Sequence, residues 1–243
     1  MKIIVFLYGM ASYALGVAAL LYLIGFVGGF LVPKTIDSGP AGALAPAMVI
    51  DLVLVAVFAF QHSVMARPGF KERWTRIVPK PAERSTYVLL TGAVLTLLFW
   101  QWEPIPIVVW NVTDPIGKGL LEALFWLGWA ILFASTFMID HFDLFGLRQM
   151  YLRLKDQPYQ PVPFVEAALY RFVRHPIMLG VLIGFWATPR MTAGHLLLAA
   201  ASTVYVFIGI ALEERDTRTA LGEAYERYRL ATSMILPLPK RKP

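Results

Sequence analysis

Cysteine is absent from this chain of 243 residues. Its absence excludes disulfide bonds, thiolate metal sites and a cysteine nucleophile. Histidine is scarce as well, with four residues in all, and the sequence has neither an H-E-x-x-H motif nor two His spaced i, i+4. Asp140, His141 and Asp143 are metal ligands by type, but with so few His residues we expect no metal site.

Charged residues are the second shortage. They make up 16% of the chain, against 58% hydrophobic residues, and the mean hydropathy is +0.61. Such an apolar composition excludes a soluble domain of this size and predicts an integral membrane protein. The first apolar run is too long for a signal-peptide core, so we expect it to be retained as the first span.

Long apolar runs are abundant instead. Backbone groups in lipid must be satisfied within their own segment, so these runs are predicted to be helices. The fifth run is short for a full crossing and should pack on the sixth as a hairpin. We therefore expect an all-α integral membrane protein, a bundle of five to six transmembrane helices forming a single domain over residues 1–243. The candidate spans are residues 3–32, 44–66, 85–102, 119–140, 177–188 and 193–212.

Lys and Arg concentrate on one side of these predicted spans. Nineteen of the 22 lie at Lys2, in residues 67–84 and 148–174, and in the tail from residue 215, whereas Lys34, Lys118 and Arg190 lie in the opposite loops. The positive-inside rule therefore predicts that both termini are cytoplasmic, as in a protein of the bacterial inner membrane. The same loops account for the net charge of +6, so we expect no nucleic-acid partner.

The loops on the side opposite the predicted cytoplasmic face are expected to be simple connectors without a functional site. Residues 33–43 and 103–118 are rich in Pro and Gly and read as simple connectors. Asp51 is expected to serve helix packing or the start of a helix. His195, at the outer turn of the hairpin, is expected at the surface.

The stretch Arg174-His175-Pro176-Ile177-Met178-Leu179-Gly180 begins the hairpin and is the strongest candidate site. Pro176 suits the first helical position, and the free N–H groups of the next turn, with Arg174 and His175, predict a site for a carboxylate or phosphate. Glu213 and Glu214 end the hairpin and should lie at the same membrane depth. They would suit an ammonium group or hydroxyls.

Two further polar groups are predicted at the same membrane face. Phe58, Gln61, His62 and Met65 share one helix face at i, i+3, i+4, i+7, and His141 follows the fourth span. Ionisable groups near a bilayer usually face the bundle interior and are a functional-site hypothesis by default. Ordinary interfacial side chains that reach water are the alternative.

The last motif is the charged amphipathic stretch of residues 221–229. One interpretation is a cytoplasmic interfacial helix held by anionic membrane lipid. The other is a lid over the hairpin, with Tyr225 and Tyr228 pointing back at the site.

These motifs resemble a known superfamily. R-H-P-x-x-x-G, an apolar hairpin, E-E and G-x-x-Y-x-x-Y over residues 171–230 are similar to the isoprenylcysteine carboxyl methyltransferase-like proteins, which bind S-adenosylmethionine through this half. Residues 61–68, 83–87, Trp100 and residues 140–149 resemble the bacterial methanethiol S-methyltransferase branch, related to NnrU-like membrane proteins. The resemblance implies methyl transfer from S-adenosylmethionine to methanethiol, a small thiol, giving dimethyl sulfide.

The resemblance also implies roles for particular residues, with residues 1–170 on the substrate side and residues 171–230 on the cofactor side. A thiol must become a thiolate to attack well, which makes His62 or His141 the candidate base and Arg84 or Arg148 the candidate thiolate stabiliser. The expected cofactor-binding residues are Arg174, His175, Pro176, Met178, Gly180, Glu213, Glu214, Tyr225 and Tyr228. The expected substrate pocket consists of Phe58, Gln61, Met65, Trp100 and Phe142.

Three alternatives remain open at this point. The chain could methylate a larger membrane acceptor, such as a prenylated cysteine carboxylate or an amine lipid. It could be a non-enzymatic NnrU-like protein that binds a ligand or partner. It could be a relative of the NADPH-dependent sterol reductases, although these would be expected to need many more spans.

Overall fold

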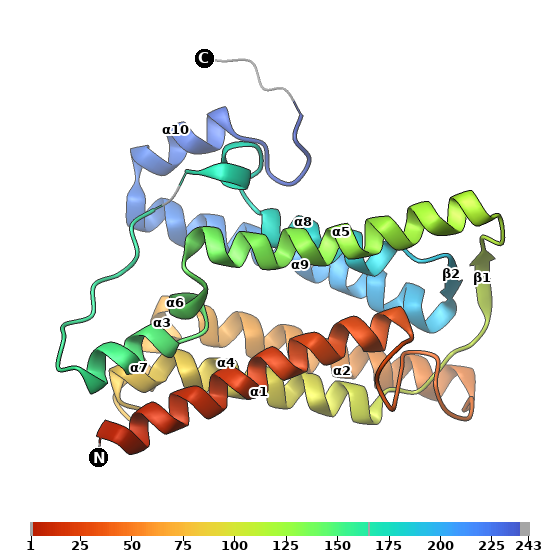
Figure 1. The fold of residues 1–243 in the computed structure, drawn as a ribbon, viewed down its shortest axis with the longest axis horizontal. Coiled ribbons are helices and arrows are strands. Elements are labelled where there is room, and N and C mark those ends of the chain that lie inside the picture. The colour runs from red at the N-terminus through yellow and green to blue at the C-terminus, as the bar shows by residue number, and fades with distance from the viewer. Residues whose placement is uncertain (1, 165, 239–243) are drawn as a thin grey trace. The chain divides into compact units, whose positions relative to one another are not determined.

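The computed structural model describes residues 2–164 and 166–238, and it is almost entirely helical (Figure 1). The helices are α1 (Lys2–Gly28), α2 (Leu44–Ala66), α3 (Pro68–Trp74), α4 (Lys80–Gln101), α5 (Pro115–Ile139), α6 (His141–Leu144), α7 (Leu147–Leu154), the 3₁₀ helix η1 (Ala168–Arg171), α8 (Pro176–Trp186), α9 (Ala193–Leu221) and α10 (Glu223–Ala231). Two short strands, β1 (Val108–Asn111) and β2 (Arg190–Thr192), pair with each other. The predicted all-α membrane fold is confirmed.

Four helices in the described part of the chain are long and apolar enough to cross a membrane: α1, α2, α5 and α9. Helix α4 has 22 residues, about 33 Å at 1.5 Å per residue, but polar residues at both ends make it less apolar. Helix α8 has 11 residues, roughly half the thickness of a bilayer core. The fifth span is therefore the short arm that the sequence predicted, and α4 is the least apolar of the long helices.

The chain divides into two compact units. The first comprises residues 1–109, 140–162 and 192–198, and the second comprises residues 110–139, 163–191 and 199–243. These units interleave along the sequence, because α5 groups with the C-terminal half of the chain. In the first unit α1 and α2 both pack on α4, and in the second α8 packs on α5.

The loops predicted to be plain connectors are ordered in the first unit. Ile36 is buried, and its carbonyl accepts a hydrogen bond from Trp102 Nε1 at 3.1 Å. Asp51 is fully buried and accepts from the backbone N–H of Glu103 at 2.9 Å, which confirms its helix-packing role. These bonds tie the chain that follows α4 to the loop after α1 and to α2.

The prediction for His195 was wrong. Its side chain is buried, with 2% exposed, rather than at the surface. The backbone N–H groups of Ala193 and Gly194 donate to the carbonyls of Ile107 and Ile105, so the chain that follows α4 covers the start of α9. No sequence pattern signalled this pairing.

Candidate active site

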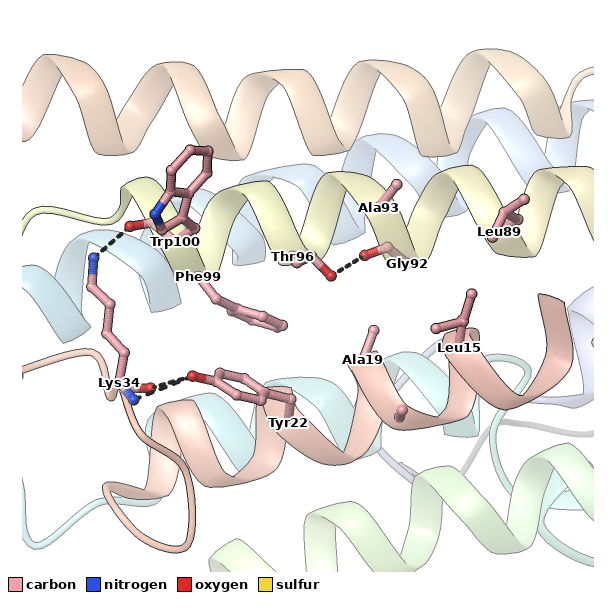
Figure 2. A pocket seen from close by; sticks show the side chains of 11 residues that line it. Leu15, Ala19, Tyr22, Lys34, Leu89, Gly92, Ala93, Thr96, Phe99 and Trp100 are labelled. Carbon is pink, nitrogen blue, oxygen red and sulfur yellow. Dashed lines mark hydrogen bonds between the residues drawn. The ribbon is translucent and has the colours of Figure 1, made fainter. Parts of the chain in front are cut away.

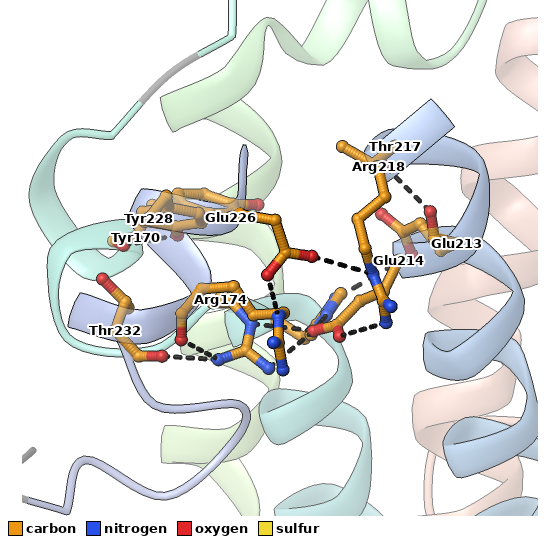
Figure 3. A network of polar contacts seen from close by, with 11 residues as sticks. Tyr170, Arg174, Glu213, Glu214, Thr217, Arg218, Glu226, Tyr228 and Thr232 are labelled. Carbon is orange, nitrogen blue, oxygen red and sulfur yellow. Dashed lines mark hydrogen bonds and ion pairs between the residues drawn. The ribbon is translucent and has the colours of Figure 1, made fainter. Parts of the chain in front are cut away.

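A buried ion cluster joins the two ends of the hairpin in the second unit (Figure 3). Arg174 Nε donates to Glu214 Oε1 at 2.7 Å, and Arg174 Nη2 lies 2.7 Å from the same oxygen. His175 Nε2 lies 3.1 Å from that oxygen as well. All three side chains are buried, so each charge needs its partners to offset the loss of hydration.

Arg174 is also bound to the C-terminal segment. Its Nη1 donates to the carbonyls of Thr232 and Arg229, the latter at 3.2 Å. The backbone N–H of Arg174 donates to Ser233 O at 2.8 Å, and that of His175 donates to Met234 O at 3.1 Å. The guanidinium therefore holds Glu214 and the segment after α10 in place, and each of its three nitrogens contacts an oxygen inside the protein.

Glu213 is the member of the acidic pair that faces outward. Its side chain is about half exposed, at 51%, against 5% for Glu214, and its carboxylate lies 3.9 Å from His175 Nδ1. Pro176 occupies the first turn of α8, and His175, at the N-cap, makes no side-chain cap bond. An open carboxylate and a helix start with free N–H groups therefore lie at one end of the hairpin.

Helix α10 packs its two tyrosines inward. Tyr225 and Tyr228 are buried, and Tyr228 Oη donates to Tyr170 O at 2.6 Å. Burial, with the charge of Glu214 adding to it, raises the pKa of Tyr225 to about 12, and burial also raises the pKa of Tyr228. Both phenols therefore stay protonated at neutral pH and can donate hydrogen bonds.

Glu226 fastens α10 to α9. It lies 3.4 Å from Arg218 Nε and accepts from Arg229 Nε at 2.8 Å (Figure 3). Arg218 in turn lies 3.9 Å from Glu214 Oε2. Ion pairs thus link the predicted lid to the buried cluster.

Gly180 and Met178 contribute packing in this structure. A Cβ on Gly180 would lie 2.5 Å from Gly128 O, so only glycine lets α8 approach the backbone of α5 so closely. Met178 packs against the buried residues Val206, Ile210 and Ile235. Both residues hold α8 between its neighbours.

A second polar group lies between α2 and α4 in the first unit. Tyr87 Oη lies 2.8 Å from His62 Nε2, and His62 Nδ1 lies 3.3 Å from Thr91 Oγ1. The ring of Phe58 stacks on that of His62 with centroids 5.2 Å apart. Arg84 reaches this group from above the Tyr87 ring, at 5.1 Å, while its Nε donates to Leu144 O at 2.7 Å.

His141 anchors a third group in the first unit. It is buried, and its Nε2 lies 3.0 Å from Tyr13 Oη. Burial lowers the pKa of His141, with the charge of Asp140 opposing the change, so the imidazole is held neutral. Asp140 has a positive φ of 156° and caps α6 by accepting from the Asp143 N–H at 3.0 Å. Arg148 pairs with Asp143 at 3.0 Å and with Asp140 at 3.7 Å.

The five residues predicted to line one substrate pocket lie apart. Phe58, Gln61 and Met65 share the α2 face, where Gln61 Nε2 lies 3.2 Å from Met65 Sδ. Trp100 lies 13 residues beyond Tyr87 on α4, about 20 Å along the helix, and 71% of it is exposed. Phe142 borders a separate cavity of about 330 Å³ with Asp140 and Arg148.

Comparison with known proteins identifies the family. The NnrU protein family model matches residues 51–235. The chain belongs to the NnrU protein family. The match includes His62, Tyr87, His141, Arg174 and both glutamates of the hairpin, and it confirms the resemblance inferred from the motifs.

Named relatives of this NnrU-family protein include two that match nearly its whole length. A methanethiol S-methyltransferase of Mycobacterium tuberculosis is 55% identical over 97% of this chain and 96% of its own, and methanethiol S-methyltransferase 1 of Bradyrhizobium diazoefficiens is 52% identical over 97% and 83%. Nurim of Bos taurus is 31% identical over 70% of this chain and 68% of its own. No solved structure matches the chain.

Sequence reasoning overlooked two tyrosines in this family member. Tyr87 and Thr91 are spaced i, i+4 on α4, and that spacing could have marked a polar face toward His62. Tyr13 gave no such signal, because it meets His141 across 128 residues of sequence. Only the fold brings that pair together.

Proposed function

We propose that this NnrU-family protein transfers a methyl group from S-adenosylmethionine to methanethiol, producing dimethyl sulfide and S-adenosylhomocysteine. The observation that carries the proposal is the 55% identity, over 97% of the chain, to a protein named methanethiol S-methyltransferase. We further propose that the reaction takes place at the cytoplasmic face of the bacterial inner membrane. The distribution of Lys and Arg supports that orientation.

The chemistry of the hairpin fits such a methyl donor. S-adenosylmethionine offers a carboxylate, an ammonium group and ribose hydroxyls. The free N–H groups at the start of α8 suit the carboxylate, and the half-exposed carboxylate of Glu213 suits the ammonium group or the hydroxyls. Arg174, His175 and Glu214 then act as positioning residues, because their buried bonds fix the start of α8 against the end of α9.

The sulfonium of the bound donor supplies an activated methyl group, so the protein needs no covalent intermediate. The protein must instead help methanethiol to lose its proton, because the thiolate attacks well and the thiol is a poor nucleophile. We propose His62 as the group that accepts the thiol proton and Tyr87 as the residue that orients its ring. Arg84, over the Tyr87 ring, would favour the negative charge of the thiolate.

His141 and Arg148 are the second candidates for these roles. The Nε2 atom of His141 is engaged by Tyr13, and Arg148 is paired with Asp140 and Asp143. The two carboxylates offset the charge of Arg148, whereas Arg84 contacts a ring and a backbone carbonyl, so Arg84 and the neighbouring His62 are the first candidates. In this structure His141 holds α6 to α1, and Arg148 holds α7 to α6.

The direct test uses purified protein in detergent with S-adenosylmethionine and a panel of acceptors. Headspace analysis should detect dimethyl sulfide from methanethiol. Methylation of a prenylated cysteine carboxylate or an amine lipid in place of the thiols would favour the larger-acceptor alternative. Absence of any methylated product from an intact, monodisperse protein would favour the non-enzymatic alternative.

A further inference from the structure

An apolar groove runs between α1 and α4 in the first unit, and no histidine of the described residues lines it (Figure 2). Its volume is about 420 Å³, within the roughly 300–1,000 Å³ of small-molecule sites. Small residues, Ala18, Ala19, Gly92 and Ala93, line its length. The sequence predicts that both helices cross the membrane, so lipid acyl chains surround this part of the protein.

A cation stands at one end of this groove. Lys34 follows the end of α1, and its Nζ donates to Trp100 O, near the end of α4, at 2.7 Å (Figure 2). Tyr22 fixes the backbone of Lys34 by two hydrogen bonds, one to the Lys34 carbonyl at 3.1 Å and one from the Lys34 N–H at 3.2 Å. The ring of Tyr22 stacks on Phe99, with centroids 4.8 Å apart.

The position of this cation matches the depth of a lipid headgroup. Both helices end there, so Lys34 and the exposed Trp100 ring lie where the hydrocarbon core gives way to the polar interface. An ammonium group has three N–H donors, and one of them is used on the Trp100 carbonyl. The others can meet phosphate oxygens.

We propose that this groove binds one molecule of an anionic phospholipid, with an acyl chain along α1 and α4 and the phosphate at Lys34. The apolar lining selects a chain, and the positive charge at its end selects an anionic headgroup. Lipid that merely wets the surface would not depend on Lys34. The site is independent of the proposed methyl transfer, because its residues belong to neither histidine group.

Native mass spectrometry of the purified protein in detergent, titrated with dioctanoyl phosphatidylglycerol, tests the proposal. We expect one lipid per chain and an affinity at least about tenfold weaker for Lys34→Gln, the loss of a charge-assisted hydrogen bond. Lys118→Gln is the matched control, because its cation pairs with Glu122 on α5, and it should bind as the unchanged protein does. Uncharged dioctanoylglycerol should bind the unchanged protein only as weakly as dioctanoyl phosphatidylglycerol binds Lys34→Gln.

A filling variant tests the groove itself. Ala93→Phe should abolish binding, whereas Leu97→Phe, at a half-exposed position of α4 outside the lining, should not. Should Ala93→Phe fail to fold, Lys34→Gln and the two lipids decide the question. Equal affinity of Lys34→Gln and the unchanged protein would overturn the proposal. So would displacement of the lipid by inorganic phosphate alone, which would indicate a simple anion site.

Discussion

Arg174 and Glu214 face each other across 40 residues of sequence, with two guanidinium nitrogens 2.7 Å from one carboxylate oxygen. Each side chain is only 5% exposed. A buried pair of this kind need not add net stability, but removing one partner leaves the other charge buried and uncompensated.

We therefore predict that Arg174→Ala or Glu214→Ala lowers the free energy of unfolding by about 3–5 kcal/mol. Thermal unfolding in detergent measures the change. Glu223→Ala is the control, because Glu223 and Arg227 form an exposed ion pair and such pairs contribute little. Similar unfolding temperatures for Glu214→Ala and Glu223→Ala would contradict the structural role of the cluster.

A substitution at Glu213 distinguishes an effect on cofactor binding from an effect on folding. Because its carboxylate is half exposed, we expect Glu213→Gln to leave the unfolding temperature unchanged and to weaken S-adenosylmethionine binding roughly tenfold or more. Isothermal titration calorimetry gives the affinity, with Glu223→Gln as a control for the loss of one surface charge. Unchanged affinity in Glu213→Gln would remove Glu213 from the binding site.

The proposed base predicts a selective defect. His62→Ala should reduce turnover roughly 10²-fold at neutral pH, keep the affinity for S-adenosylmethionine, and recover in part at high pH, where free thiolate becomes abundant. Tyr87→Phe, which keeps the ring and removes the hydroxyl beside His62, should give a smaller loss with the same trend. A structural histidine would instead show lost expression or lost affinity without recovery.

His141 predicts how stability depends on pH. Its pKa in the folded protein lies below the ordinary value of 6.5, because burial disfavours the charged form. The unfolded chain therefore binds a proton more readily as the pH falls through 6.5, so stability is lost on acidification and kept above that pH. In His141→Gln the unfolding temperature should fall less between about pH 7 and pH 5 than it does in the unchanged protein. Parallel curves for the two proteins would contradict this assignment.

The sequence predicted the features that depend on composition and on helix spacing. The apolar runs identified the long helices and the short arm, and the two ends of one hairpin were predicted to place Arg174 and Glu214 at the same membrane depth. The close approach of α8 to α5 could not be predicted from the sequence. A glycine such as Gly180 in an apolar helix does not indicate that a Cβ there would clash with the carbonyl oxygen of Gly128.

Long-range partners were equally hidden. Tyr13 and His141 belong to distant segments, and the hydrogen bond between them depends on how α1 packs against α6 within the first unit. Trp100 was expected in one pocket with Phe58 because it belongs to a motif, yet it borders the groove between α1 and α4 and is 71% exposed. A motif indicates which residues occur together with a function, but the distance between two of them depends on their separation along the helix.

The proposal of methyl transfer is tested most directly by following the methyl group itself. Purified protein is incubated with methanethiol and S-adenosylmethionine deuterated in its S-methyl group, and the headspace is analysed by gas chromatography with mass spectrometry. The account predicts dimethyl sulfide that carries one deuterated methyl group, with its amount reduced in Glu213→Gln and His62→Ala. Dimethyl sulfide without the label, or no dimethyl sulfide from folded protein, would contradict it.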